Sequence, residues 1–184
     1  LAAGGQGMIT VAAACGVAGM IAGTITMTGL ANMLINGIVA LAGDQVIVAL
    51  VLTMLCCIVL GMGVPTTAPY CIMAATCPPI LTRMGVPILA AHFFVFYFGI
   101  VADITPPVAL AAYAGSAIAK SNPMRTAFNA TKLAIAAFII PYVFCFSPAM
   151  LLIETNAVEV ALISITSLVG IFGVASALEG YLLT

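Results

Sequence analysis

The stretch GMGVPTTAPY, residues 61–70, interrupts one of the most apolar parts of the chain. It contains two glycines, two prolines and two adjacent threonines, residue types that end one helix and begin another. Apolar residues flank it on both sides, so the interruption lies inside a segment suited to lipid. Because lipid offers no hydrogen bonds to a broken backbone, this interruption needs a structural or functional reason.

The composition points to a membrane protein. Of the 184 residues, 65% are hydrophobic and 5% are charged. A soluble domain carries about 25% charged residues, so a soluble globular protein is disfavoured. The apolar residues run continuously instead of alternating with polar ones, which favours spanning helices over a β-barrel. We therefore predict an all-α polytopic membrane protein. The chain begins with Leu1 and shows no signal peptide, so we expect it to be a piece of a longer protein.

Several classes of function find no support in the sequence. A phosphate-binding loop with a lysine and a basic patch are both absent, so we expect neither ATP hydrolysis nor nucleic-acid binding. No His, Cys, Ser and Asp constellation suggests an enzyme, and His92 has no partner nearby in the sequence. The cysteines form no C-x-x-C motif and all lie in apolar runs, so we expect buried small hydrophobic side chains. They are Cys15, Cys56, Cys57, Cys71, Cys77 and Cys145.

The apolar segments predict a series of helices. Residues 8–30 form a first spanning helix rich in small residues, and 31–44 form a shorter connecting helix at the membrane interface. Residues 133–147 complete a further span, which the chain enters from about Ala127, and 158–182 form the last one, with a turn region between them. We divide the chain into a spanning and connecting part (1–44), a transport-type unit (45–126) and C-terminal spanning helices (127–184).

A helical hairpin is predicted at residues 45–83. Residues 45–62 form an apolar helix, and the opening stretch supplies a tip at 63–68. The apolar segment 70–82 has thirteen residues, or about 20 Å of helix, whereas the hydrocarbon core is about 30 Å thick. Tandem prolines bend this segment further. Since it is too short to cross the bilayer, we interpret it as the return arm, 69–83, of a re-entrant hairpin.

The next apolar segment has the opposite problem. Residues 87–119 would make about 50 Å of helix, too long for one straight span. The stretch VADITPPVAL, residues 101–110, interrupts it. Thr105 can cap a new helix, and Pro106 suits the first position because its missing N–H would be unpaired there anyway. We therefore predict a discontinuous helix with halves at 87–101 and 106–119 and a break at 102–105.

The few charges suggest an orientation. Residues 120–132 are predicted to be a polar loop, which carries Lys120, Arg125 and Lys132. The positive-inside rule places this loop in the cytoplasm. The hairpin mouth, with Asp44 and Arg83, then faces the outside.

Two breaks at membrane depth predict a pathway for an ion or solute. Each break leaves a helix end with bare carbonyls, which suits a small cation such as Na⁺, and a helix start with bare N–H groups, which suits a carboxylate. Thr66, Thr67 and Thr105 add neutral oxygens, and Asp103 is the only carboxylate within the broken helix. A plainer interpretation stays open, in which the threonines only cap helices and Asp103 only bonds local N–H groups.

Three segments of the chain closely resemble the DctM-like large permease of the tripartite ATP-independent periplasmic (TRAP) transporters. They are LGMGVPTTAPY (60–70), AAHFFVFYFGIVADITPPVALAAYAGSAIA (90–119) and PMRTAFNATKLAIAAFIIPYVF (123–144). The likeness is nearest to the fused form, in which the small and large membrane subunits share one chain. It covers about residues 5–150.

The resemblance implies an elevator-type secondary transporter with two inverted repeats, of which this chain would be the second. It implies Na⁺-driven uptake of an organic acid across the bacterial inner membrane, with no cofactor besides the coupling ion. The expected partners are a periplasmic substrate-binding protein, a small membrane subunit or its fused equivalent, and the lipid bilayer. An alternative of similar architecture is an ion- or proton-coupled antiporter or exchanger, which would need Asp103 as its titratable carboxylate.

The resemblance also implies a site where the hairpin tip meets the break. The residues expected to hold Na⁺ are Gly61, Gly63, Thr66, Asp103 and Thr105. The residues expected beside the substrate are Pro65, Thr66, Thr67, Pro106 and Pro107.

Overall fold

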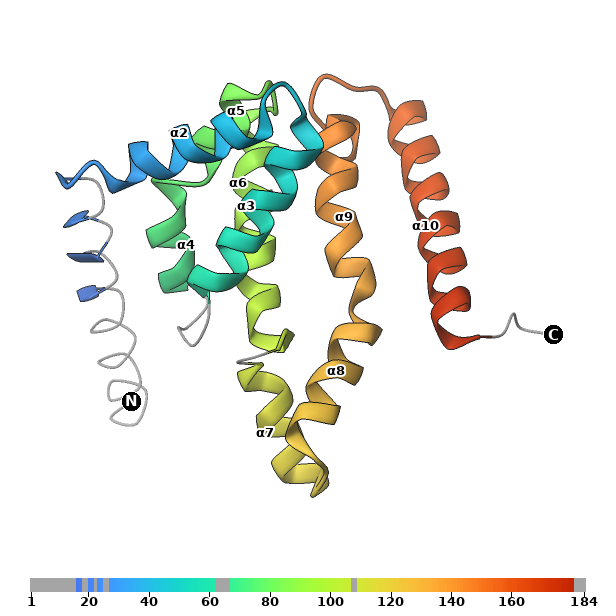
Figure 1. The fold of residues 1–184 in the computed structure, drawn as a ribbon. Coiled ribbons are helices and arrows are strands. Elements are labelled where there is room, and N and C mark those ends of the chain that lie inside the picture. Colours follow the sequence, from blue (N-terminus) through green and yellow to red (C-terminus); the bar gives the residue numbers. More distant parts are fainter. Residues whose placement is uncertain are drawn as a thin grey trace, which may run out of the picture.

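A computed structural model describes residues 27–61, 67–106 and 109–180, together with residues 16–17, 20–21 and 23–24 (Figure 1). Every regular element in these ranges is a helix, as the composition predicts. Most of the predicted first span, residues 8–30, lies outside the described residues.

Helix α2 (Leu30–Ala42) corresponds to the predicted connecting helix. It lies across one end of the molecule, whereas the helices that follow run along its length (Figure 1). The helix ends at Gly43, whose φ of 57° is a conformation that glycine adopts without a steric penalty. The chain can therefore turn sharply into α3 (Val46–Gly61), which is the predicted apolar helix at 45–62.

The return arm consists of two short helices, α4 (Thr67–Ala74) and α5 (Pro78–Arg83). Pro78 and Pro79 occupy the first turn of α5 and cannot donate the backbone hydrogen bonds that would join it to α4. Together with α3 they form a helical hairpin whose two ends lie at the same end of the molecule (Figure 1). Arg83 Nη1 donates to Asn36 Oδ1 of α2 at 3.1 Å, which ties the end of the return arm to the connecting helix.

Helix α6 (Ile88–Val101) occupies the centre of the fold and packs against α3, α4, α5 and α9. Phe94, Val95 and Phe98 are fully buried on it. The ring of Phe94 meets those of Phe98 and Tyr142 edge to face, with centroid separations of 4.8 and 5.3 Å. Since aromatic pairs in such arrangements are favourable beyond their buried area, this cluster anchors α9 to α6.

The break after α6 is longer than predicted. A short turn, η1 (Ala102–Ile104), follows α6, and α7 begins only at Leu110 (Leu110–Ala119). The prediction that Thr105 caps a helix starting at Pro106 was therefore wrong. The backbone of Thr105 is extended, and its hydroxyl donates to the Val101 carbonyl behind it instead of capping a helix ahead.

The predicted polar loop at 120–132 was also wrong, because helix α8 (Pro123–Leu133) occupies most of it. Asn122 caps this helix by accepting a hydrogen bond from the Arg125 N–H at 3.1 Å. Pro123 supplies the first turn with a preset φ. Only residues 120–122 connect α7 to α8, and the two form a tight hairpin at the end of the molecule opposite α2 (Figure 1).

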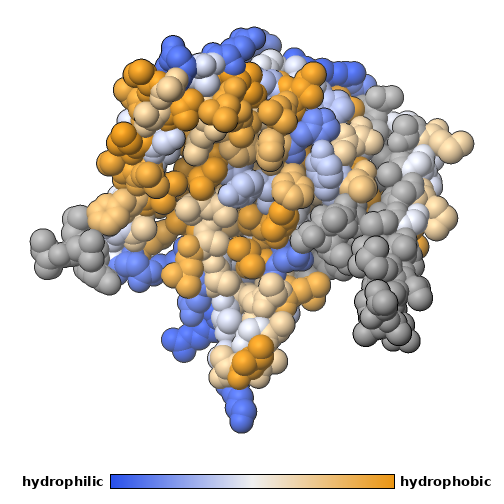
Figure 2. Space-filling model, turned by 180° about the vertical axis from the view of Figure 1, so that it is seen from behind, coloured by the Kyte–Doolittle hydropathy of each residue, from blue (hydrophilic) through white to orange (hydrophobic). Residues whose placement is uncertain are grey.

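The C-terminal part follows the prediction more closely. Helix α9 (Ile135–Phe146) continues α8, the turn η2 (Pro148–Leu151) follows, and α10 (Ala157–Glu179) is the last element. By length and composition, Pro123–Phe146 and Ala157–Glu179 are candidate membrane spans. Hydrophobic residues cover much of the body of the molecule in Figure 2, which suits contact with lipid.

The Asn122 cap leads to a first prediction. Asn122→Ala removes the acceptor for the Arg125 N–H and should destabilise the α7–α8 hairpin by about 1 kcal/mol. Asn122→Asp retains an acceptor at the same position and is the matched control. Thermal unfolding in detergent should show a lower midpoint for the alanine variant only, and equal midpoints for both variants would contradict the cap.

Candidate functional site at the break of helix α6

The end of α3 and the break of α6 lie in direct contact. A Cβ added to Gly61 would lie 2.9 Å from the Gly99 carbonyl oxygen and 3.0 Å from the Ala102 Cβ. Both distances are too short for a side chain, so only glycine allows this approach. The end of α3 at Gly61, where the hairpin tip begins, therefore contacts the broken helix at Ala102, one residue before Asp103.

Pro106 and Pro107 remove the helical hydrogen-bond donors of the Asp103 carbonyl. In a helix, the Asp103 carbonyl would accept from the N–H three or four residues ahead, and these positions are Pro106 and Pro107. Neither proline has an N–H. The Asp103 carbonyl oxygen is therefore left without a helical donor, next to its own carboxylate.

The carbonyls around Asp103 do have partners. The Ala102 carbonyl accepts from the Thr105 N–H at 3.3 Å, and the Val101 carbonyl accepts from the Thr105 hydroxyl at 2.7 Å. The Thr131 hydroxyl of α8 lies 3.0 Å from the Ile104 carbonyl oxygen and 3.0 Å from the Ala127 carbonyl oxygen of its own helix, so its one proton is shared between the two acceptors. Thr131 thus supports the break from another helix. Sequence reasoning missed this role, because 27 residues separate Thr131 from Ile104 and no local pattern links them.

Two predicted site side chains lie within the break itself. Asp103 is partly exposed, and its carboxylate makes no hydrogen bond or ion pair to another residue in the described ranges. The Thr105 hydroxyl uses its proton on Val101, so its oxygen lone pairs stay available to a cation. The break therefore presents a carboxylate, a carbonyl without a helical donor and a hydroxyl oxygen, the ligand type that hard cations prefer.

The remaining predicted residues are only partly described. Pro106 directly follows Thr105 in the break, and Thr67 is the first residue of α4. The other positions lie outside the described residues: Gly63, Pro65, Thr66 and Pro107.

A histidine–tyrosine pair is a feature that the sequence did not reveal. The Tyr70 hydroxyl of α4 lies 3.0 Å from His92 Nδ1 of α6, so His92, which has no partner nearby in the sequence, has one in the fold. The Tyr70 ring also packs edge to face on Phe96, with centroids 5.6 Å apart. The pair borders an apolar pocket of about 290 Å³ and joins the return arm to the central helix. Twenty-two residues separate the two side chains, so no local pattern indicates the contact.

Comparison with known proteins now identifies the family. A model of the family described as "Tripartite ATP-independent periplasmic transporter, DctM component" matches residues 1–158. This chain belongs to the DctM family. Searches of curated proteins and of solved structures found no match. The DctM assignment makes the protein a component of a membrane transporter, and the break of α6 is the natural place to seek its transport site.

The glycine contact leads to a second prediction. Gly61→Ala should force α3 away from Gly99 and destabilise this DctM protein by about 1–3 kcal/mol. Gly37→Ala in α2, where nothing lies within 4 Å of an added Cβ, is the control. Unfolding in detergent should separate the two variants clearly. A Gly61→Ala variant as stable as the control would show that the helices do not approach this closely.

The Tyr70–His92 contact leads to a third prediction. Tyr70→Phe should cost about 0.5–1.5 kcal/mol by removing one hydrogen bond while keeping the ring. His92→Leu should cost at least as much, but little more when Tyr70→Phe is already present. Unfolding free energies of the two single variants and the double variant measure this coupling. Strictly additive effects would show that the two side chains do not interact.

Proposed function

We propose that this DctM chain is part of a permease that uses a Na⁺ gradient to take up an organic acid delivered by a periplasmic binding protein. The observation that carries the proposal is the Asp103 carbonyl, whose helical donors are both replaced by prolines, beside its own carboxylate. The family assignment supports transport, and the oxygen ligands at the break support a small hard cation.

In the proposed site, Na⁺ binds between the hairpin tip and the break. Asp103 contributes carboxylate and carbonyl oxygens, and Thr105 contributes its hydroxyl oxygen. Gly61, Gly63 and Thr66 contribute from the tip. The contact between Gly61 and Ala102 supports this arrangement, because it brings the end of α3 to the break. The cation offsets the negative charge of Asp103 and the partial negative charge at the end of α6.

The substrate carboxylate binds after the cation in this proposal. The candidate residues beside it are Pro65, Thr66, Thr67, Pro106 and Pro107. Helix α4 begins at Thr67, so its first N–H groups lie next to the tip and favour an anion. A bare anion would cross the membrane at high cost, whereas a paired cation and anion move as a compensated charge. Ordered binding of this kind couples uptake to the Na⁺ gradient.

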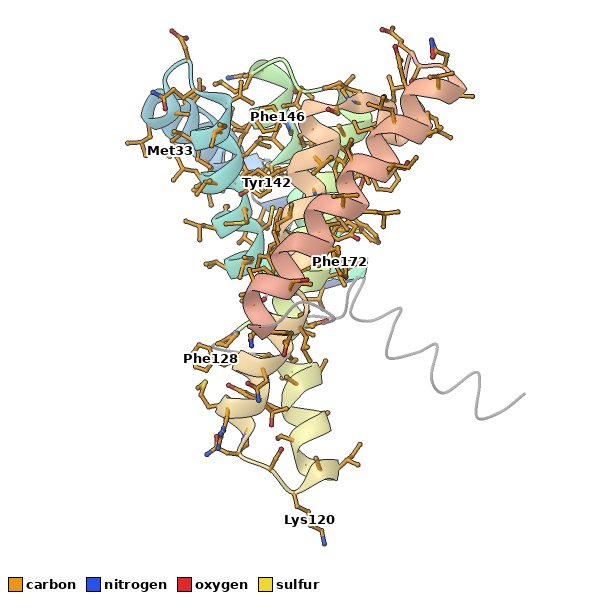
Figure 3. All side chains as sticks on the ribbon, turned by 90° about the vertical axis from the view of Figure 1, so that its right-hand side faces the viewer. Met33, Lys120, Phe128, Tyr142, Phe146 and Phe172 are labelled. Carbon is orange, nitrogen blue, oxygen red and sulfur yellow. The ribbon has the colours of Figure 1, made fainter. Side chains whose placement is uncertain are left out.

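The distribution of cations supports an orientation for this permease. Lys120 lies at the tip of the α7–α8 hairpin, far from the end where Met33 and Phe146 lie (Figure 3). Arg125 and Lys132 belong to the same hairpin. The positive-inside rule then places this hairpin in the cytoplasm and the mouth of the α3–α5 hairpin outside. We propose that the α3–α5 hairpin is re-entrant and moves as part of an elevator-type unit.

In this orientation the mouth of the hairpin faces the periplasmic binding protein. The small membrane subunit, or its fused equivalent, completes the assembly in the inner membrane. A second candidate is exchange of an ion against protons, because the Asp103 carboxylate has no partner in the described part of the chain and can serve as a titratable group.

The fourth prediction tests the coupling ion. The full-length parent protein is reconstituted into proteoliposomes with its binding protein and candidate organic acids outside, and an inward Na⁺ gradient is imposed. Uptake should require both Na⁺ and the binding protein. Thr66→Val/Thr105→Val removes two proposed ligands and should raise the half-saturating Na⁺ concentration by at least about tenfold, or ~1.4 kcal/mol of binding free energy.

Two further variants sharpen this experiment. Thr82→Val alters a threonine whose hydroxyl donates to Pro79 in the return arm, away from the break, and should leave the Na⁺ dependence unchanged. Asp103→Asn should weaken Na⁺ binding in the symporter. A different result would favour the proton-coupled exchanger over the symporter. In that result, uptake would not depend on Na⁺, would be driven by an imposed pH gradient and would be lost in Asp103→Asn.

A further inference from the structure

The α7–α8 hairpin packs mainly on itself. Figure 1 shows it extending beyond the other described helices. Among the described residues, its main packing partners outside the pair are η1 and α9, the elements next to it along the chain. Its small buried core consists of alanines, none of which belongs to the main core around α6: Ala109, Ala112 and Ala127. Packing alone therefore does little to fix the hairpin against the rest of the protein.

Both connections between this hairpin and the rest of the protein are interrupted helices. On one side the chain passes through the break after α6, and Ala109 at the end of the break has a φ of 40°, which is unusual for a residue with a side chain. On the other side α8 gives way to α9 at Ala134, whose ψ of 16° is far from the helical value. A continuous helix resists bending, whereas two interruptions leave the tilt of the hairpin to be set by other contacts.

One hydrogen bond joins α8 to the break itself. The Thr131 hydroxyl lies 3.0 Å from the Ile104 carbonyl oxygen and also 3.0 Å from the Ala127 carbonyl oxygen of its own helix. The Ile104 carbonyl cannot accept from the residue three positions ahead, because that residue is Pro107 and has no N–H. Thr131 thus supplies a donor that the backbone at Pro107 does not.

An ion pair also links α8 to another element, but it is the weaker contact. Lys132 Nζ lies 3.6 Å from Glu179 Oε1 at the end of α10, and the two side chains are 45% and 50% exposed. Exposed ion pairs contribute little, because water and salt screen them. The pair also joins α8 to α10 and not to the break. The hydrogen bond of Thr131 is therefore the contact best placed to fix α8 against the break.

We propose that Thr131 is a positioning residue that holds the α7–α8 hairpin and the oxygens of the break in one arrangement, and thereby sets the affinity for the coupling cation. The Asp103 carbonyl and the Ile104 carbonyl belong to neighbouring planar peptide units, separated only by the two dihedral angles of Ile104. Restraining one carbonyl therefore limits the other. A ligand set that is already ordered binds with a smaller entropy loss. The effect on affinity rests on the proposed Na⁺ site, whereas the restraint of the break does not.

The experiment uses the full-length parent protein and three single variants. Thr131→Val removes the hydroxyl and keeps the shape of the side chain, and Thr131→Ser keeps the hydroxyl. Thr126→Val is the matched control, because the Thr126 hydroxyl also donates to the carbonyl four residues earlier on α8, at 3.0 Å. Its partners, Asn122 and Ser121, lie at the other end of the hairpin from the break.

Hydrogen–deuterium exchange of the break is the first readout, and it is measured without Na⁺. In Thr131→Val, peptides that cover the Thr105 and Ala109 N–H groups should exchange about two- to tenfold faster, the change expected for the loss of one hydrogen bond. Thr131→Ser and Thr126→Val should exchange like the native protein in these peptides. Unchanged exchange in Thr131→Val would overturn the positioning role.

The Na⁺ dependence of uptake in proteoliposomes is the second readout. Thr131→Val should raise the half-saturating Na⁺ concentration by a similar factor and keep the maximal uptake rate, and Thr131→Ser should restore the native value. Faster exchange with an unchanged half-saturating concentration would show a merely structural role and overturn the link to affinity. If uptake by the native protein does not depend on Na⁺, the proposed symport fails, whereas the exchange comparison still decides whether Thr131 positions the break.

Discussion

The rest of the structure depends on one constraint: backbone groups that a broken helix leaves unpaired must find partners within the protein, because lipid offers none. Pro106 and Pro107 break the long helix after α6, and other elements gather around the break. The Thr105 hydroxyl donates to the Val101 carbonyl, and the Thr131 hydroxyl of α8 shares its proton between the Ile104 carbonyl and the Ala127 carbonyl of its own helix. The position of α8 is thus linked to the break by a hydrogen bond as well as by packing.

Tandem prolines act in the same way at two places in this chain. Pro106 and Pro107 interrupt the α6–α7 helix, and Pro78 and Pro79 interrupt the return arm of the hairpin. In both cases the prolines remove donors from carbonyls four residues earlier, so the chain bends where the apolar sequence alone would continue a helix. Small residues then allow neighbours to approach, as at the contact of Gly61 with Gly99. At the break after α6, a helix break and a close helix contact therefore occur together.

The sequence predicted the features that local chemistry determines. Apolar length and the prolines indicated the hairpin, the break near Asp103 and the last helix. Two local signals were misinterpreted. Residues 120–132 were predicted to be a loop because they are polar, although Asn122 and Pro123 form a typical helix start and α8 begins there. Pro106 was predicted to begin a helix that in the structure begins at Leu110. The Tyr70–His92 pair could not be predicted from the sequence, because only the packing of α4 on α6 brings these distant residues together. Of the candidate site, the sequence suggested candidate ligands, which stay a prediction, and did not suggest the contact of Thr131 with the break.

The Asp103 carbonyl, which has no helical donor, links the stability of the break to the ion in the proposed mechanism. A carbonyl that lacks a donor costs up to about 1–3 kcal/mol where water cannot reach it, and in this mechanism a bound cation offsets that cost. The same cation would also contact the hairpin tip, whose first end at Gly61 already lies against the break. Loss of the cation would therefore weaken the break and its contact with the tip together. In this proposal, coupling between ion and substrate needs no long-range pathway, because both would bind at one junction whose geometry the ion would complete.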